Sequence, residues 1–454
     1  MVKLVLTLLG VDYLRKRWKA ICIAGWLWAI AGVVIFIDAL DNAIYFPINF
    51  FAALLMLDGV ATLAVAWTGM GGQRALRLLK GVAFVLAAVL ILAGHHHGNF
   101  ILSMIFGTLF LLDGALQAAS AWVVRYPRWR AALVGAGIEI LLAVFFYQPY
   151  PTHYVGTVPY CLGLGLMFSG WSLLLLGYRV RRLPQRALLS TMLERPTALF
   201  WADQNTDLDA NAPLVWDGPP AASERALTVH VWTPVGSARS KALRRPLIDR
   251  YIAAVDAEGV ISTGHAALES PEGIYISLYP AVEIDRSPDD FARLLRATRE
   301  NDVPGLFQPD YAYESKAWCE STVKVRIRNY SPERLRLFWE QYRQDTTYNL
   351  TWRNCSSTVA RALEAAVEGS VGHFYGRDRG WSAFFRMLLT PELWVAAQIR
   401  KRAKTMAWTP GLTLDYARAV SMLVDPRPFG WFKMAKLAVR KMVRNRREQA
   451  SRTT

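Results

Sequence analysis

The hydrophobic positions in roughly the first 180 residues fall into six long runs separated by short polar segments. The runs cover residues 20–37, 46–68, 78–94, 99–123, 131–147 and 155–178. Each is long enough, or nearly so, to cross the hydrocarbon core of a bilayer as an α-helix. The pattern therefore predicts an all-α bundle of six transmembrane helices in this part of the chain.

The segments that flank and connect these runs alternate in charge. Four are basic, with the sequences RKRWK, GGQRALRLLK, RYPRWR and YRVRR, and three contain no Lys or Arg, with the sequences DALDN, GHHHGN and YQPYPT. The four basic segments all fall on one side of the predicted bundle. Because positively charged loops favour the cytoplasmic side, we expect the N-terminus and everything after Arg182 to be cytoplasmic.

An internal repeat relates the even-numbered runs. LMLDGVATLAVAW in the second run resembles FLLDGALQAASAW in the fourth and LMFSGWSLLLLG in the sixth, and Gly59, Gly114 and Gly170 are 55 and 56 residues apart. A two-helix hairpin used three times, with small residues in one register, can pack closely. Asp58 and Asp113 occupy equivalent repeat positions, which favours a packing role; a functional carboxylate inside the membrane is the alternative.

This repeat, with its basic loops, resembles the HdeD family (the DUF308 repeat) of bacterial inner-membrane proteins over about residues 15–180. The resemblance implies a multi-pass protein of the bacterial inner (plasma) membrane that is linked to acid and stress resistance. It implies no catalytic chemistry.

The patterns after about residue 225 are those of a soluble α+β domain. ALTVHVWTPV and STVKVRIRN alternate as strands, and GHAALESPEGIYISLYP predicts a hairpin around the SPEG turn. Two segments predict helices, RRPLIDRYIAAVDAEG and SPERLRLFWEQYRQ; in the second, Ser331 is the expected N-cap and Pro332 the first helical residue. We expect a papain-like domain with an antiparallel sheet at 226–385, after a linker at 183–225.

Cys355 lies where a turn gives way to a helix, in YNLTWRNCSSTVARALEAA. With Asn354 or a nearby serine as N-cap, the positive end of the helix dipole faces the sulfur and favours the thiolate. A cysteine nucleophile also needs a base. Of the histidines in this region, His265 follows a glycine at the start of a strand, whereas His230 has the apolar neighbours of a structural residue.

The order GHAAL, IYISLYP and then NCSSTVARAL resembles the permuted NlpC/P60 branch of the papain-like superfamily, which includes lecithin retinol acyltransferase-like, YiiX-like and DUF4105-type proteins. The resemblance implies that Cys355 is the nucleophile and His265 the base. It places a polar third residue on the next strand, where Ser277 stands; Glu269, on the same strand face as His265, is the alternative. Tyr348 is a candidate oxyanion donor or a packing residue.

The charge of +16 and the basic segment at 386–454 leave two classes of partner, nucleic acid and anionic lipid. The arginines cluster beside apolar runs, which favours the bilayer and its anionic headgroups over nucleic acid. TPELWVAAQIRKRAKTMAW and GWFKMAKLAVRKMVRNRREQ combine aromatic and basic residues, so we expect 386–454 to lie on the membrane surface as amphipathic helices.

These patterns give the expected organisation and function. A membrane domain at 1–182 anchors a cysteine hydrolase or acyltransferase that acts on an amide, ester or thioester of a small acyl, lipid or peptide substrate at the cytoplasmic membrane face. Four cysteines without metal-type spacing predict neither a cofactor nor a metal. The alternative is a non-catalytic stress-resistance membrane protein whose soluble part is a binding module. The oligomeric state is left open.

Overall fold

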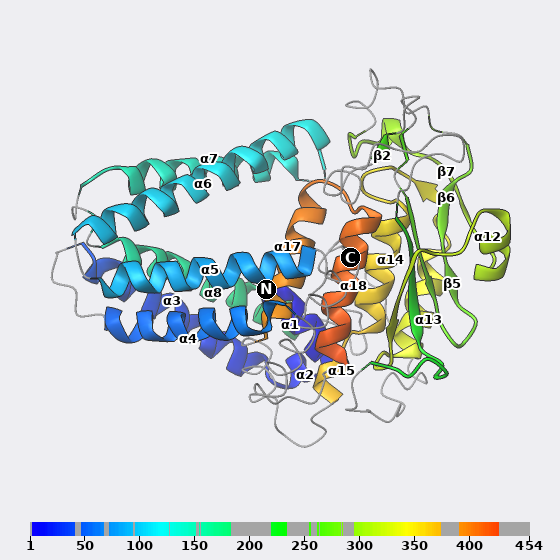
Figure 1. Cartoon of the computed structure of the whole chain (residues 1–454), viewed down its shortest axis with the longest axis horizontal. Helices are drawn as coiled ribbons and strands as arrows, with labels where there is room; N and C mark the ends of the chain where they lie inside the picture. The colour runs from blue at the N-terminus through cyan, green and yellow to red at the C-terminus, as the bar shows by residue number, and fades with distance from the viewer. Residues whose placement is uncertain are drawn as a thin grey trace, which may run out of the picture. The chain divides into compact units, whose positions relative to one another are not determined.

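The structure is a computed structural model that describes residues 2–182, 219–233, 254–284, 295–373 and 390–425, with short breaks at 41–46, 68–71, 94–95, 127, 151–153, 155, 256–260, 263 and 283. Within these residues, contacts divide the chain into two units. We call them the membrane unit, built on the long apolar helices, and the soluble unit, which holds the sheets (Figure 1). Each is described separately.

Six helices in the described part of the chain are long and apolar enough to cross a membrane, which confirms the predicted multi-pass bundle. They are α3 (Trp18–Asp38), α4 (Ile48–Ala66), α5 (Gly72–Leu92), α6 (His96–Val124), α7 (Trp129–Tyr147) and α8 (Thr157–Arg181). Their outward-facing Leu, Ile, Val and Phe side chains are extensively exposed in the absence of lipid, as expected for helices whose surroundings are acyl chains.

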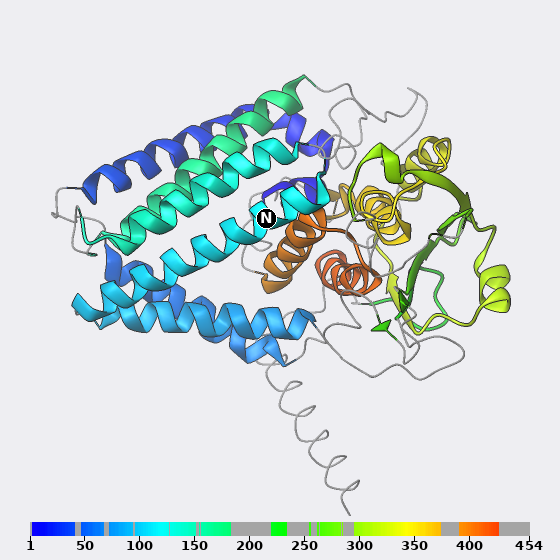
Figure 2. The ribbon, with the colours of Figure 1, turned by 90° about the horizontal axis from the view of Figure 1, so that it is seen from above.

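The glycines of the repeat lie at close contacts between helices. A Cβ on Gly59 of α4 would come within 3.1 Å of the carbonyl oxygen of Gly81 on α5, and one on Gly170 of α8 within 2.6 Å of that of Gly25 on α3. Gly114 of α6 approaches α7 in the same way. Each repeat glycine thus packs an even-numbered span on the next odd one, the sixth on the first. Figures 1 and 2 show two of these pairs side by side, α3 with α8 and α4 with α5.

Asp58 forms an ion pair inside the α4–α5 contact. Its carboxylate lies 2.8 Å from Nζ of Lys80, which is itself 3.5 Å from Oγ1 of Thr62. Two opposite charges from neighbouring helices compensate each other where water is scarce. This geometry agrees with the packing role expected for Asp58.

The main sheet of the soluble unit has four antiparallel strands in the order β5-β4-β1-β8. They are β1 (Leu227–Trp232), β4 (His265–Glu269), β5 (Tyr275–Ile276) and β8 (Val323–Ile327). One face is apolar, with Val229, Val231, Ala266 and Leu268 fully buried, and it packs on α14 (Cys355–Ala366) and α18 (Pro410–Val424). The opposite face carries His230, Trp232 and His265, because side chains alternate along a strand.

Two smaller sheets complete the soluble unit. The first joins β6 (Leu278–Pro280), β7 (Val303–Phe307) and β9 (Thr347–Tyr348), and the second joins β2 (Ala254–Val255) and β3 (Ile261–Ser262). The strand β2 contradicts the end of the helix expected over RRPLIDRYIAAVDAEG; residues 244–253 lie outside the described part. Connecting elements are η1 (Arg299–Asn301), α12 (Tyr311–Ala317), α13 (Pro332–Tyr342) and α15 (Ser370–His373).

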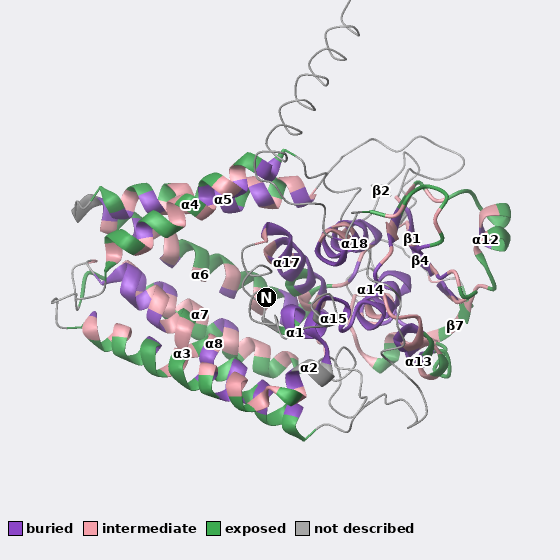
Figure 3. Cartoon of the chain, turned by 90° about the horizontal axis from the view of Figure 1, so that it is seen from below, coloured by how far each residue is buried: buried purple, intermediate pink, exposed green. Residues whose placement is uncertain are grey.

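We expected the segment after residue 386 to form helices on the membrane surface, and this expectation is wrong for the helices that the structure describes there. The helix α17 (Pro391–Thr405) is buried along most of its length and packs on α18, which in turn packs on the main sheet (Figure 3). The basic residue Arg400 makes a bidentate bond to the buried carboxylate of Glu364 at 2.6 and 2.8 Å. These helices therefore belong to the soluble core; residues 426–454 lie outside the described part.

The segment before the first span also belongs to the soluble unit, although we expected the membrane domain to begin at residue 1. The helix α1 (Val2–Leu9) packs on α15 and α17, and α2 (Val11–Lys16) follows it. The amide of Gly369 donates to the carbonyl of Thr7 at 3.0 Å. Leu4, Val5 and Leu8 are at most 2 % exposed, which explains why this short apolar helix is stable here.

Candidate functional site

Cys355 is the first residue of α14, and the sequence around it forms a complete helix cap. The side chain of Asn354 accepts from the amide of Ser357 at 2.8 Å, and the Ser357 hydroxyl accepts from the amide of Asn354 at 2.9 Å. The predicted helix start and its cap are confirmed. The sulfur therefore sits at the positive end of a capped helix of twelve residues.

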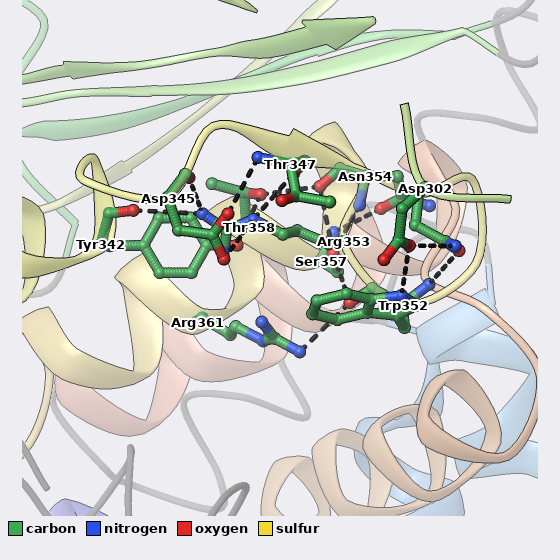
Figure 4. A network of polar contacts seen from close by, with 11 residues as sticks. Asp302, Tyr342, Asp345, Thr347, Trp352, Arg353, Asn354, Ser357, Thr358 and Arg361 are labelled. Atoms are coloured by element: carbon green, nitrogen blue, oxygen red, sulfur yellow. Dashed lines mark hydrogen bonds and ion pairs between the residues drawn. The ribbon is translucent and has the colours of Figure 1, made fainter. Parts of the chain in front are cut away.

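Arg353 holds the loop that leads into this helix (Figure 4). Its buried guanidinium donates to the carbonyls of Thr347 at 2.8 Å, Tyr342 at 3.1 Å and Asp345, and it lies 3.9 Å over the ring of Tyr342. Its backbone pairs with Asn349 in both directions, at 3.0 and 3.2 Å. The position of Cys355 is thus fixed by the residue two places before it.

A second anchor on the same loop is Asp302, at the end of η1. One of its oxygens accepts from Nδ2 of Asn349 at 2.8 Å and from Nε1 of Trp352 at 3.2 Å (Figure 4). Tyr348 is buried in β9, with its backbone opposite Val303, a location that fits packing.

His265 begins β4, directly after Gly264, whose φ of +69° bends the chain into the strand. Its Nε2 lies 2.8 Å from the hydroxyl of Ser277 and 3.1 Å from a carboxylate oxygen of Glu314. The ring stacks on Tyr279 with centroids 4.2 Å apart. The structure thus brings Ser277 to the imidazole, at the position that the family resemblance gave to the third residue.

Glu314, on α12, is the site residue that sequence reasoning missed. It accepts from Tyr275 and, at 2.9 Å, from Tyr279, besides facing His265. Burial raises its pKa, but these three donors outweigh burial and lower the pKa to about 2. The sequence did hold a signal for the helix, since Asp310 caps it by accepting from the amide of Tyr313 at 2.7 Å, but nothing in the local pattern places that helix over β4.

Cys355 and His265 are coupled electrostatically, and each favours the charged form of the other. Burial opposes charge on both, but the imidazolium lowers the pKa of the Cys355 thiol, aided by hydrogen bonds from Ser356 and the amide of Ala266. The thiolate and Glu314 in turn raise the pKa of His265 to about 9.

Glu269, the alternative third residue, is not part of this arrangement. It shares a strand face with His265 as expected, but its carboxylate lies 3.0 Å from Nε2 of His230. Four residues along an extended strand correspond to about 13 Å, so Glu269 meets the histidine of the neighbouring strand instead.

No known protein family, curated protein or solved structure matches this chain. The two family resemblances seen in the sequence therefore stay predictions.

Chemically, the site joins a thiol, a base and an acid that orients the base. The amides of Cys355 and Ser356 have no carbonyl partner within α14, because the first amides of a helix never do, so they are available to a developing oxyanion. Among the described residues, no group of three or more His, Cys, Asp or Glu is placed to hold a metal.

Proposed function

We propose that this protein is a membrane-anchored cysteine hydrolase or acyltransferase that acts on an amide, ester or thioester through an acyl-enzyme. The observation that carries the proposal is the buried chain Cys355–His265–Glu314, with Ser277 beside Nε2. A thiol with a depressed pKa, a histidine charged by it and a carboxylate behind the histidine are the components of nucleophilic catalysis.

The proposed reaction begins with attack of the Cys355 thiolate on the carbonyl carbon. The carbonyl oxygen becomes an oxyanion held by amides at the start of α14, and collapse of this intermediate expels the leaving group, which takes its proton from the imidazolium of His265. Neutral His265 then removes a proton from water or another acceptor as it attacks the thioester. Release of the product regenerates thiolate and imidazolium, while Glu314 keeps the ring oriented throughout.

The proposed location is the cytoplasmic face of a bacterial inner membrane, supported by the basic loops between the spans. Thr7 precedes the first span, Gly369 follows the last, and the two are hydrogen-bonded. An even number of crossings must separate two residues that touch, so this hydrogen bond supports the proposal that both flanking segments lie on one side of the membrane. Anionic headgroups and a small acyl, lipid or peptide substrate are the proposed partners.

Covalent trapping tests the proposal. Purified protein is incubated with a small activated ester or thioester between pH 5 and 9, and the Cys355 peptide is examined by mass spectrometry. We expect an acyl adduct on Cys355 in the wild type, none in Cys355→Ala, and little in His265→Ala. The absence of any adduct on Cys355 across this range would reject the proposal in favour of a non-catalytic binding module.

A further inference from the structure

His230 is a buried titratable residue that the proposed reaction does not use. It is 2 % exposed, and both ring nitrogens have partners: Nδ1 lies 3.1 Å from the hydroxyl of Ser321 and Nε2 lies 3.0 Å from Glu269. In the neutral ring, Nε2–H donates to the carboxylate, so Nδ1 accepts from Ser321. The ring is thereby fixed in one orientation.

Tyr311, the first residue of α12, stacks on this fixed ring. The centroids of Tyr311 and His230 are 4.1 Å apart and the planes are inclined by 24°. The Tyr311 hydroxyl accepts from the amide of Ser321 at 3.2 Å and lies 3.3 Å from the Ser321 hydroxyl. Each of His230, Ser321 and Tyr311 therefore contacts the other two. These contacts fix the first residue of α12.

The helix α12 needs such supports because seven residues are too few to form a stable helix in isolation. Its other end is held where Trp318 stacks on Trp232 with centroids 5.7 Å apart. Glu314 lies one turn after Tyr311, between the two stacks. Because the two residues lie one helical turn apart, a displacement of Tyr311 would move this carboxylate relative to His265, which lies 3.1 Å from it.

We propose that His230 is a positioning residue of the candidate site: it fixes Tyr311 and thereby α12, so that Glu314 is held against His265. The inference rests on the proposed Cys355–His265 pair. It assigns His230 no contact with substrate, and its influence passes entirely through Glu314.

The test follows the thiolate of Cys355 by its rate of alkylation with iodoacetamide as a function of pH, in a Cys319→Ser background because Cys319 is exposed. Modification of the Cys355 peptide is read by mass spectrometry. We expect His230→Ala to shift the acid limb upward by about half a pH unit, which is about threefold less thiolate on that limb. In a Glu314→Gln background the same substitution should shift nothing further.

Tyr311→Leu removes the stack without changing the main sheet, so it provides a second variant should His230→Ala fail to fold. Tyr330→Phe is the matched control: it deletes a tyrosine hydroxyl bonded to Glu272, 2.8 Å away, at a different place on the soluble unit. An equal shift with and without Glu314, or no shift in folded His230→Ala and Tyr311→Leu, overturns the inference. A wild type whose Cys355 reacts only as an ordinary thiol overturns the proposed function instead.

Discussion

Nε2 of His265 lies 3.1 Å from Oε1 of Glu314. His265 belongs to strand β4 of the main sheet, and Glu314 belongs to the short helix α12, which packs on the face of the sheet that carries His230 and Trp232. Each is at most 3 % exposed. Because Glu314 also receives two tyrosine hydroxyls, the carboxylate remains ionised beside the imidazole.

Removing the charge of Glu314 should weaken the Cys355–His265 ion pair. Glu314→Gln preserves size but withdraws the anion that stabilises the imidazolium, so the pKa of His265 should fall and that of Cys355 should rise. We expect a shift of about one pH unit, a tenfold loss of thiolate on the acid limb, in the iodoacetamide profile. Glu272→Gln, beside Tyr330, is the control; an unchanged profile in Glu314→Gln would show that Glu314 does not orient His265.

Ser277→Ala should slow acylation less than Glu314→Gln does. It removes a neutral hydroxyl 2.8 Å from Nε2, a hydrogen bond of about 1 kcal/mol, or roughly fivefold in the acylation rate. A larger loss than in Glu314→Gln, measured by acylation under single-turnover conditions, would make Ser277 rather than Glu314 the principal orienting residue.

The pH dependence of acyl transfer should differ from that of alkylation. The imidazolium exists below the His265 pKa of about 9, and the thiolate exists above the depressed pKa of Cys355. Acyl transfer needs both, so its rate should rise on the acid side and fall as pH passes about 9. Alkylation needs only the thiolate and should not fall there; parallel losses of both rates above pH 9 would contradict the assignment of His265 as the proton donor.

Gly10→Ala should destabilise the soluble unit. Gly10 has a φ of +83°, and an added Cβ would lie 2.8 Å from the Cα of Gly369. Gly273→Ala is the control, since its φ of +86° gives the same backbone strain with nothing within 4 Å of the new Cβ. We expect Gly10→Ala to cost about 1–3 kcal/mol more than the control in thermal unfolding of the detergent-solubilised protein. Equal losses of stability in the two variants would mean that the backbone around Gly10 and Gly369 accommodates the added Cβ at little cost.

The Asp58–Lys80 pair predicts a compensating double variant. Asp58→Asn leaves the largely buried Lys80 ammonium without its carboxylate in the membrane unit, at a cost of about 3 kcal/mol. Asp58→Asn combined with Lys80→Met should recover most of this loss in detergent unfolding assays. If the double variant is stable but loses activity in cells, Asp58 has a functional role and not only the packing role that its position in the repeat favoured.

The sequence was most informative where one local rule decides the structure. The six spans followed from hydrophobic length alone, and the starts of α13 and α14 followed from their caps, Ser331 and Asn354. It misled where burial depends on a distant partner. The apolar and basic residues of α17 suggest a helix on a lipid surface. In the structure, however, Arg400 binds the carboxylate of Glu364 and the helix packs on α18.

The residues of the candidate site also differ in whether a local pattern in the sequence could reveal them. Cys355, His265 and Ser277 lie in segments whose turns and strands can be recognised locally, and the expectation that they come together rested on the family resemblance. Glu314 could not be recognised, because its role depends on α12 crossing a sheet formed by β1, β4 and β8, and such long-range pairings have no local signature. The prediction of Glu269 as the third residue was wrong because the neighbouring strand β1 carries His230, which binds the Glu269 carboxylate.

The burial of α1 has a consequence for how the protein is made. Residues 2–9 leave the ribosome before any membrane span, yet they pack on α15 and α17, which are translated after all six. This eight-residue apolar segment is therefore synthesised long before the helices on which it packs. The soluble unit can reach its final fold only after translation has passed residue 424, by which point all six apolar helices have been synthesised.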